Sequence, residues 1–115
     1  MTESEFLTMA AETLDNIESS LEQAAAVSDL DLEFSRSGNV LEIEFVDNAS
    51  KIIINSQAPM QEIWVAAKSG GFHYKREGSQ WINTRNASEL FAALSEMVSL
   101  QSGCELTLHP DIEKQ

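Results

Sequence analysis

Cysteine and histidine are scarce in this chain, and the scarcity excludes several classes of protein. The 115 residues include one cysteine, Cys104, and two histidines, His73 and His109. One thiol excludes an internal disulfide, and it excludes a thiolate zinc site or an iron–sulfur cluster held by this chain alone. Neither Cys104 nor a serine lies in a recognisable nucleophile motif. We therefore expect a protein that is not an enzyme, and the single thiol suits a reducing cytoplasm.

Long apolar runs and a basic N-terminal segment are also missing. No run of about 18 apolar residues occurs, so we expect no membrane span and no membrane partner. Glu3 and Glu5 stand where a secretory or organellar signal would carry Lys or Arg. The length suits one core. We expect a single domain over residues 1–109, a flexible tail over residues 110–115, and a cytoplasmic location.

Positive charge is scarce in the first half of the chain. Residues 1–50 contain 12 acidic residues and one basic residue, Arg36, whereas the remainder is nearly balanced. The net charge of −12 opposes contacts with phosphates, so we expect no nucleic-acid partner. Charge alone leaves three interpretations open: a site for cations, a patch for a basic protein, or a solvated surface.

Apolar spacing predicts a helix near each end of the chain. Residues 4–24 repeat apolar side chains every three or four positions, with Ser4 as the expected N-cap. A second helix is expected after Asn86 as N-cap, with Glu89 in the capping-box position and Gly103 as its end. The polar side of the first helix carries Glu5, Glu12, Asp15, Glu18 and Glu22. The acids nearest its C-terminus oppose the helix dipole, which favours a functional role over a stabilising one.

Between the two helices the apolar pattern changes to a period of two, which is typical of strands. Turn signals, such as Ser37-Gly38-Asn39, Pro59 and Gly70-Gly71, separate the segments. The expected strands are residues 29–34, 40–45, 51–55, 62–67, 72–75 and 81–82. The sequence therefore predicts an α+β fold: a two-layer sandwich with an antiparallel sheet of about six strands and both terminal helices packed on one face.

Carboxylates recur at spacings that allow two of them to share an ion. Glu18 and Glu22 are one helical turn apart, and Asp29, Asp31 and Glu33 alternate along an expected strand. Oxygen ligands of this kind suit hard cations such as Fe³⁺ and Fe²⁺. Because no histidine joins them, we expect weak binding at the surface.

The tryptophans differ in their expected roles. Trp64 alternates with Ile63 and Val65, so it faces outward if these two are core residues. An exposed aromatic side chain is a typical anchor of a protein interface. Trp81 has no such pattern, and we expect it to be structural. A lone histidine such as His73 is more often an ordinary side chain than a metal ligand.

The element order and three motifs resemble the frataxin family in its bacterial, CyaY-type form. The similarity extends from about Ser4 to about residue 108, and the middle motif is the most specific. The motifs are Lys51-Ile52-Ile53-Ile54-Asn55-x-Gln57-x-Pro59, Ile63-Trp64-Val65-Ala66-x-Lys68-x-Gly70-Gly71-x-His73, and Trp81-Ile82.

The resemblance implies an iron-binding regulator or iron donor in iron–sulfur cluster assembly. It implies weak binding of Fe²⁺ and Fe³⁺, which other divalent cations can replace, and docking on cysteine desulfurase and the iron–sulfur scaffold protein. It also implies a monomer, with iron-dependent oligomers as a further expectation. Matched by position, the metal-binding acidic ridge consists of Glu18, Glu22, Asp29, Asp31, Glu33 and Glu44. The partner-binding positions are Asn55, Gln57, Trp64 and His73.

One departure and two alternatives accompany this resemblance. Residues 23–27 lack the additional carboxylates that relatives usually carry there, so the acidic ridge is sparser. The first alternative is an iron-oxidising storage protein, which would need a di-iron centre with His or buried Glu ligands. The second is an acidic protein-interaction module without a physiological metal.

Overall fold

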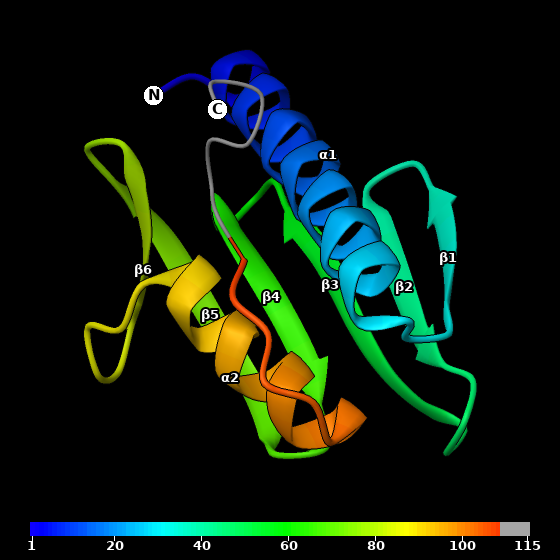
Figure 1. Ribbon diagram of the computed structural model, residues 1–115. Helices are drawn as coiled ribbons and strands as arrows, with labels where there is room; N and C mark the ends of the chain where they lie inside the picture. The colour runs from blue at the N-terminus through cyan, green and yellow to red at the C-terminus, as the bar shows by residue number, and fades with distance from the viewer. Residues whose placement is uncertain (109–115) are drawn as a thin grey trace.

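Two helices cover one face of a six-stranded antiparallel sheet (Figure 1). The computed structural model describes residues 1–108, so the expected domain boundary at residue 109 and the expected tail lie outside the described residues. The strands lie in the order β1-β2-β3-β4-β5-β6, so each pairs with the next along the chain. The predicted two-layer α+β sandwich is confirmed. The elements are α1 Glu3–Ser28, β1 Leu32–Ser37, β2 Val40–Phe45, β3 Ser50–Gln57, β4 Glu62–Ala67, β5 Gly70–Glu77, β6 Gln80–Asn83 and α2 Leu90–Ser102.

Helix α1 begins earlier than the apolar pattern predicts, with Thr2 as its N-cap. The Thr2 hydroxyl accepts a hydrogen bond from the Glu5 backbone N at 3.1 Å, and the Thr2 backbone N donates to Glu5 Oε1 at 2.8 Å. The hydrogen bond from the Thr2 backbone N stabilises the charged form of the Glu5 carboxyl and so lowers its pKa. The expectation that Ser4 caps the helix is wrong. A capping box needs Glu or Gln three residues after the cap; Glu5 holds that position relative to Thr2, whereas Leu7 holds it relative to Ser4.

Helix α1 also ends later than expected. Residues 25–28, which lie between the expected helix over residues 4–24 and the expected strand over residues 29–34, continue the helix to Ser28. Alanines at 24–26 have the highest helix propensity and explain the extension. Asp29 follows as the C-cap in the left-handed conformation, with φ 56°. The expected strand over residues 29–34 is therefore wrong in its boundaries, and β1 begins at Leu32.

The turn between β4 and β5 lies before the glycine pair. Lys68 and Ser69 form the turn, and Gly70 and Gly71 are the first residues of β5 rather than the turn itself. Gly70 has φ +136°, a conformation that side-chain-bearing residues rarely adopt. The glycine is thus required where the chain enters the strand.

Helix α2 is capped by Glu89, not by Asn86. The Glu89 side chain accepts a hydrogen bond from the Ala92 backbone N at 3.1 Å. Asn86 instead accepts hydrogen bonds from the backbone N and the hydroxyl of Ser88, at 3.0 and 2.6 Å, within the preceding turn. The expected end of α2 at Gly103 is confirmed, with φ 78°.

One apolar core joins the helices to the inner face of the sheet. Trp81 is 2% exposed, its ring meets Phe6 edge-on at 5.9 Å, and its Nε1 donates to Thr13 Oγ1 at 2.8 Å. The predicted structural role of Trp81 is confirmed. After α2, the chain returns along that helix: the backbone N atoms of Leu106 and Leu108 donate to the hydroxyls of Ser99 and Ser95.

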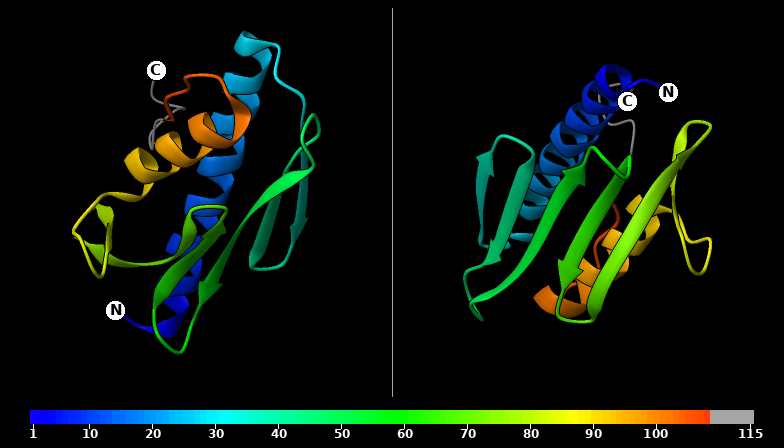
Figure 2. Two further views of the ribbon diagram at one scale, coloured as in Figure 1. Left: turned by 90° about the horizontal axis from the view of Figure 1, so that it is seen from below. Right: turned by 180° about the vertical axis from the view of Figure 1, so that it is seen from behind.

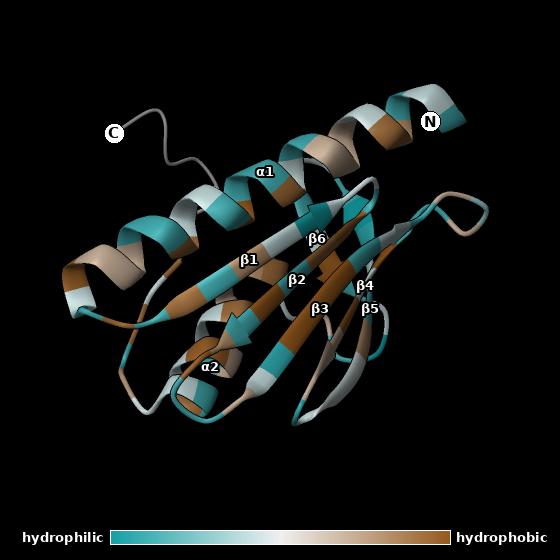
Figure 3. Cartoon of the chain, turned by 90° about the vertical axis from the view of Figure 1, so that its right-hand side faces the viewer, coloured by the Kyte–Doolittle hydropathy of each residue, from teal (hydrophilic) through white to brown (hydrophobic). Residues whose placement is uncertain are grey.

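The opposite face of the sheet is covered by neither helix (Figure 2, right). Hydrophilic and hydrophobic residues alternate along α1, as expected for a helix with one buried side (Figure 3). Within residues 1–108, no helix is both long and apolar enough to cross a membrane. On the uncovered face of the sheet, outward side chains of adjacent strands lie next to one another.

Candidate partner-binding and metal-binding surfaces

The register of the sheet brings the expected partner-binding residues together. Asn55 on β3 pairs with Trp64 on β4, and Trp64 pairs with His73 on β5. Gln57 lies two residues beyond Asn55, so it shares the same outward parity. We call Asn55, Gln57, Trp64 and His73 the sheet patch. All four lie on the uncovered face.

Contacts between its side chains organise the sheet patch. The rings of Trp64 and His73 stack with centroids 4.3 Å apart and planes 7° from parallel. Gln57 Nε2 donates to Asn55 Oδ1 at 2.6 Å. Trp64 is half-buried and faces outward, so its predicted orientation is confirmed. Accessible aromatic rings are enriched in protein interfaces and often dominate their binding energy.

Glu62 belongs to the same cluster, although the sequence interpretation did not include it. Its Oε1 accepts a hydrogen bond from Trp64 Nε1 at 2.7 Å and lies 3.5 Å from His73 Nδ1. Its Oε2 lies 3.8 Å from Lys75 Nζ. The available signal was its position two residues before Trp64, which gives it the same outward parity.

Two members of the acidic ridge form a carboxylate pair on the uncovered face. Glu33 on β1 lies directly opposite Glu44 on β2. Opposed positions of this kind have Cβ atoms about 5 Å apart, and like charges there destabilise the sheet. Lys51 lies opposite Glu44 on β3, but its Nζ contacts Glu42 Oε2 at 2.7 Å. Glu33 and Glu44 are thus placed to share a hydrated cation.

The other members of the acidic ridge lie at the edge of the molecule. Arg36 of β1 contacts Asp15 at 2.8 Å and Glu18 at 3.8 Å, so Glu18 is partly neutralised. Glu22, one turn further along α1, is exposed. Asp29 and Asp31 are exposed in the connection between α1 and β1. The expectation that both lie along a strand is wrong, because β1 begins at Leu32.

The acidic ridge does not close into a metal centre. Among residues 1–108, no group of three or more His, Cys, Asp or Glu side chains lies in position to hold one ion. Separate carboxylates on an open surface fit weak, largely hydrated binding of hard cations. Weak iron binding stays a prediction. An iron-oxidising centre would need several ligands gathered around one site.

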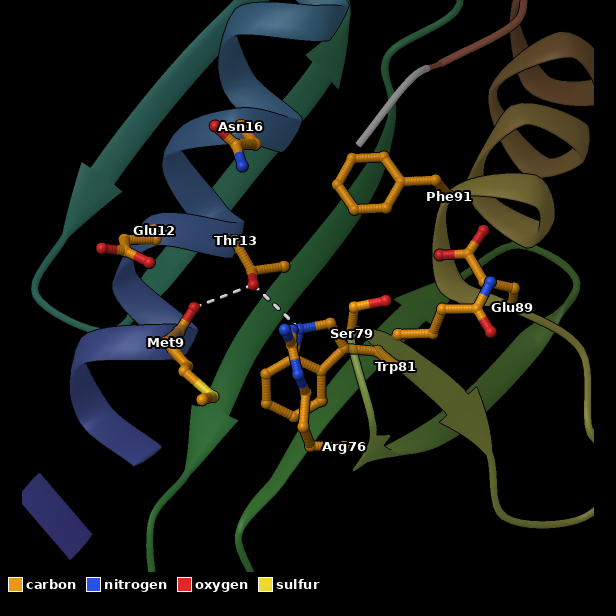
Figure 4. A pocket seen from close by; sticks show the side chains of 10 residues that line it. Met9, Glu12, Thr13, Asn16, Arg76, Ser79, Trp81, Glu89 and Phe91 are labelled. Atoms are coloured by element: carbon orange, nitrogen blue, oxygen red, sulfur yellow. Dashed lines mark hydrogen bonds between the residues drawn. The ribbon is translucent and has the colours of Figure 1, made fainter. Parts of the chain in front are cut away.

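A separate polar cavity of about 400 Å³ lies on the helical side of the molecule (Figure 4). Residues of α1, the β5–β6 hairpin and the start of α2 line it, among them Glu12, Arg76 and Glu89. The Arg76 guanidinium lies 5.4 Å from the centre of the Trp81 ring. None of the expected site residues lines this cavity, and no sequence pattern indicates it because it depends on how distant segments pack.

The fold and its surfaces define a two-layer α+β protein with an open sheet face, on which an aromatic–amide patch lies near paired carboxylates. Comparison with known proteins identifies the group to which it belongs. The frataxin-like domain model matches residues 1–104. The chain belongs to the frataxin-like family, and the resemblance inferred from the motifs is confirmed.

Curated relatives and solved structures agree with this assignment. The iron–sulfur cluster assembly protein CyaY of Herminiimonas arsenicoxydans is 70% identical over 108 residues, which are 94% of this chain and 96% of the relative. The protein of the same name from Janthinobacterium sp. (strain Marseille) is 72% identical over the same lengths. Frataxin from Psychromonas ingrahamii superposes with TM-score 0.77 and 31% identity, covering 93% of this chain and 97% of that one. Trimeric yeast frataxin complexed with ferrous iron gives TM-score 0.71 and 27% identity, covering 83% and 86%.

Proposed function

We propose that this chain is a non-enzymatic accessory protein of iron–sulfur cluster assembly that docks on cysteine desulfurase and its scaffold protein and binds iron weakly. Relatives that match nearly the whole chain bear the name of a cluster assembly protein. The observation that carries the proposal is that the Glu33–Glu44 pair and the sheet patch share one uncovered face.

The two surfaces lie close enough for one partner to contact both. Lys51, opposite Glu44, and Asn55 in the sheet patch are four residues apart on β3, about 13 Å along the strand. Trp64 is two strands away from Glu44, about 10 Å across the sheet. The direct separation is thus roughly 16 Å, and a standard interface of about 800 Å² per partner spans that distance.

The two surfaces suit different parts of the docking reaction. The acidic ridge attracts a basic surface of cysteine desulfurase over a distance of about one Debye length. The sheet patch offers an aromatic anchor and amide groups, which act only after close contact. Charge then guides the approach, and the sheet patch determines how the assembly machinery is held.

Iron is cargo or signal in this proposal, not a tightly held cofactor. The exposed carboxylates of the acidic ridge provide oxygen ligands but no enclosed site. Such a surface exchanges Fe²⁺ readily with water and also accepts other divalent cations. The yeast relative complexed with ferrous iron supports an iron-binding role. A reducing cytoplasm is the compartment that suits this function.

Reconstituted cluster assembly tests the proposal. Purified cysteine desulfurase, scaffold protein, cysteine and Fe²⁺ are mixed under anaerobic conditions with increasing amounts of this chain, and cluster formation is followed by visible absorbance and circular dichroism. We expect a saturable change in rate and a stable complex in sedimentation. A protein of similar size and net charge serves as control. Equal rates with and without the chain, together with no complex, would refute the docking function.

A further inference from the structure

Glu62 is a buried carboxylate on a face that no helix covers. Its residue is 5% exposed, whereas neighbouring outward residues such as His73 and Lys75 are exposed. A buried carboxylate is costly unless hydrogen bonds and positive charge compensate it. Here Trp64 Nε1 donates to it and Lys75 Nζ lies 3.8 Å away. The buried carboxylate of Glu62 is therefore placed to orient the side chains that it contacts, Trp64 and His73.

The hydrogen bond from Trp64 fixes the orientation of the indole ring. The indole has one N–H group and no acceptor, so a single partner determines where its edge points. At 2.7 Å, the bond to Glu62 Oε1 is short for a nitrogen donor, as expected with a charged acceptor. The ring held in this way stacks its face against His73 at 4.3 Å.

The same carboxylate oxygen also acts on His73. A neutral imidazole carries its proton on one of two nitrogens, and the environment selects which. Oε1 of Glu62 lies 3.5 Å from Nδ1, so its negative charge favours the proton at Nδ1. Nε2, at the far end of the ring, is then left with a lone pair. The His73 side chain is 46% exposed, so a partner can reach it.

We propose that Glu62 is a positioning residue that holds Trp64 and His73 as one preformed platform and presents His73 Nε2 as a hydrogen-bond acceptor to a donor group of the docked partner. The inference rests on the proposed docking function of the sheet patch. A platform that is already ordered loses little conformational entropy when the partner binds. We expect the partner surface to carry an N–H, O–H or S–H group that donates to His73 Nε2, next to a group that packs on the Trp64 indole.

The tautomer of His73 tests the first half of the proposal in the free protein. Long-range ¹H–¹⁵N correlation spectra are recorded at about pH 8.5, where an ordinary imidazole is neutral. We expect Nδ1–H as the main form in the wild type. Glu62→Gln keeps an acceptor for Trp64 but removes the charge, so it should change the tautomer ratio alone. Glu62→Met removes both, so it should also shift the indole N–H signal.

A matched control and a direct refutation accompany this measurement. Glu77→Gln removes one carboxylate from the same face of β5 and should leave the His73 and Trp64 signals unchanged. Amide spectra remote from β4 and β5 show whether each variant is folded. A wild-type protein with Nε2–H as its main tautomer overturns the proposal, whatever the variants do.

Affinity for the desulfurase–scaffold complex tests the second half. We expect about a tenfold loss for Glu62→Met, about threefold for Glu62→Gln and none for Glu77→Gln, because a disordered anchor must be ordered on binding. If Glu62→Met binds with wild-type affinity while Trp64→Ala binds more weakly, the positioning role of Glu62 alone is refuted. Wild-type affinity in Trp64→Ala refutes the docking function on which this role depends.

Discussion

The sheet patch and the acidic ridge, which we propose act together in recognition, differ in internal order. In the sheet patch each side chain contacts another: Trp64 stacks on His73, and Gln57 donates to Asn55. In the acidic ridge, and among residues 1–108, only Glu18 has an ion-pair contact, with Arg36, and Glu33 and Glu44 face each other as like charges.

This difference shows how the two regions would recognise a partner. Ordered groups lose little entropy on binding and discriminate by shape, so they determine how long a complex lasts. Charged surface carboxylates interact over about 10 Å and are screened by salt, so they mainly affect the rate of association. Four predictions examine this division, from the largest expected effect to the smallest.

Replacement of Trp64 by alanine should weaken binding to the desulfurase–scaffold complex about 30-fold or more, because an aromatic anchor at the centre of an interface contributes about 2 kcal/mol or more. Biolayer interferometry should show faster dissociation with little change in association. Ile82→Ala, at the far edge of the same face, is the matched control. A loss below threefold for Trp64→Ala would mean that the sheet patch does not anchor the partner.

Charge reversal in the acidic ridge should have a smaller, kinetic effect. The double variant Glu22→Lys and Asp31→Lys should slow association with cysteine desulfurase about tenfold at low ionic strength and flatten its salt dependence. Stopped-flow fluorescence measures both quantities. Glu96→Lys, on α2, should leave them almost unchanged. An effect confined to the dissociation rate would contradict electrostatic guidance and would remove the contrast between the two surfaces.

Metal binding should depend unequally on the members of the acidic ridge. Replacing both Glu33 and Glu44 by glutamine should weaken Co²⁺ or anaerobic Fe²⁺ binding at least about fivefold, since even one pair of unit charges about 4 Å apart contributes about 1 kcal/mol in water. Glu18→Gln should change the affinity less than twofold, because Arg36 already neutralises part of the Glu18 charge. Paramagnetic broadening of amide signals locates and quantifies the ion. Equal losses in both variants would mean that the ridge binds as a diffuse charge.

Much of the fold follows from periodicity alone, because a sheet with one buried face requires alternation at every second residue. The six strands and both helices could therefore be predicted. The bounds of β2 and β4 and the end of α2 match the expectation, whereas both ends of α1 differ from it. Thr2 caps α1 because Glu5 completes its capping box, and Ala25 extends the helix through its propensity.

The candidate site was predictable in composition but not in arrangement. Alternation places Trp64 outward, and the family resemblance supplies the residues of both surfaces. The burial of Glu62 depends on side chains from β4 and β5 together, which no local pattern contains. The ion pair of Glu18 with Arg36 likewise could not be predicted, because it joins side chains of two elements, α1 and β1.

Lys51 lies between the two regions, and its removal should extend the acidic one. It stands opposite Glu44, and its hydrogen bond to Glu42, with the charges of Glu42 and Glu44, raises its pKa above the usual 10.5. Lys51→Met should therefore strengthen Co²⁺ binding at Glu33 and Glu44 about twofold, because one screened positive charge is removed. Lys75→Met, beside Glu62, is the matched control and should leave the affinity unchanged.

The same variant has a pH signature that checks its cause. Because the pKa of Lys51 is raised in the folded state, its contribution to stability is complete below pH 10.5 and is lost as pH rises through the higher folded value. Urea unfolding should therefore show a shallower alkaline loss of stability in Lys51→Met than in the wild type. Some loss remains, since burial raises the pKa of Tyr74 as well. If Lys51→Met shows the wild-type loss of stability at alkaline pH and the wild-type Co²⁺ affinity, the charge of Lys51 does not limit the acidic ridge.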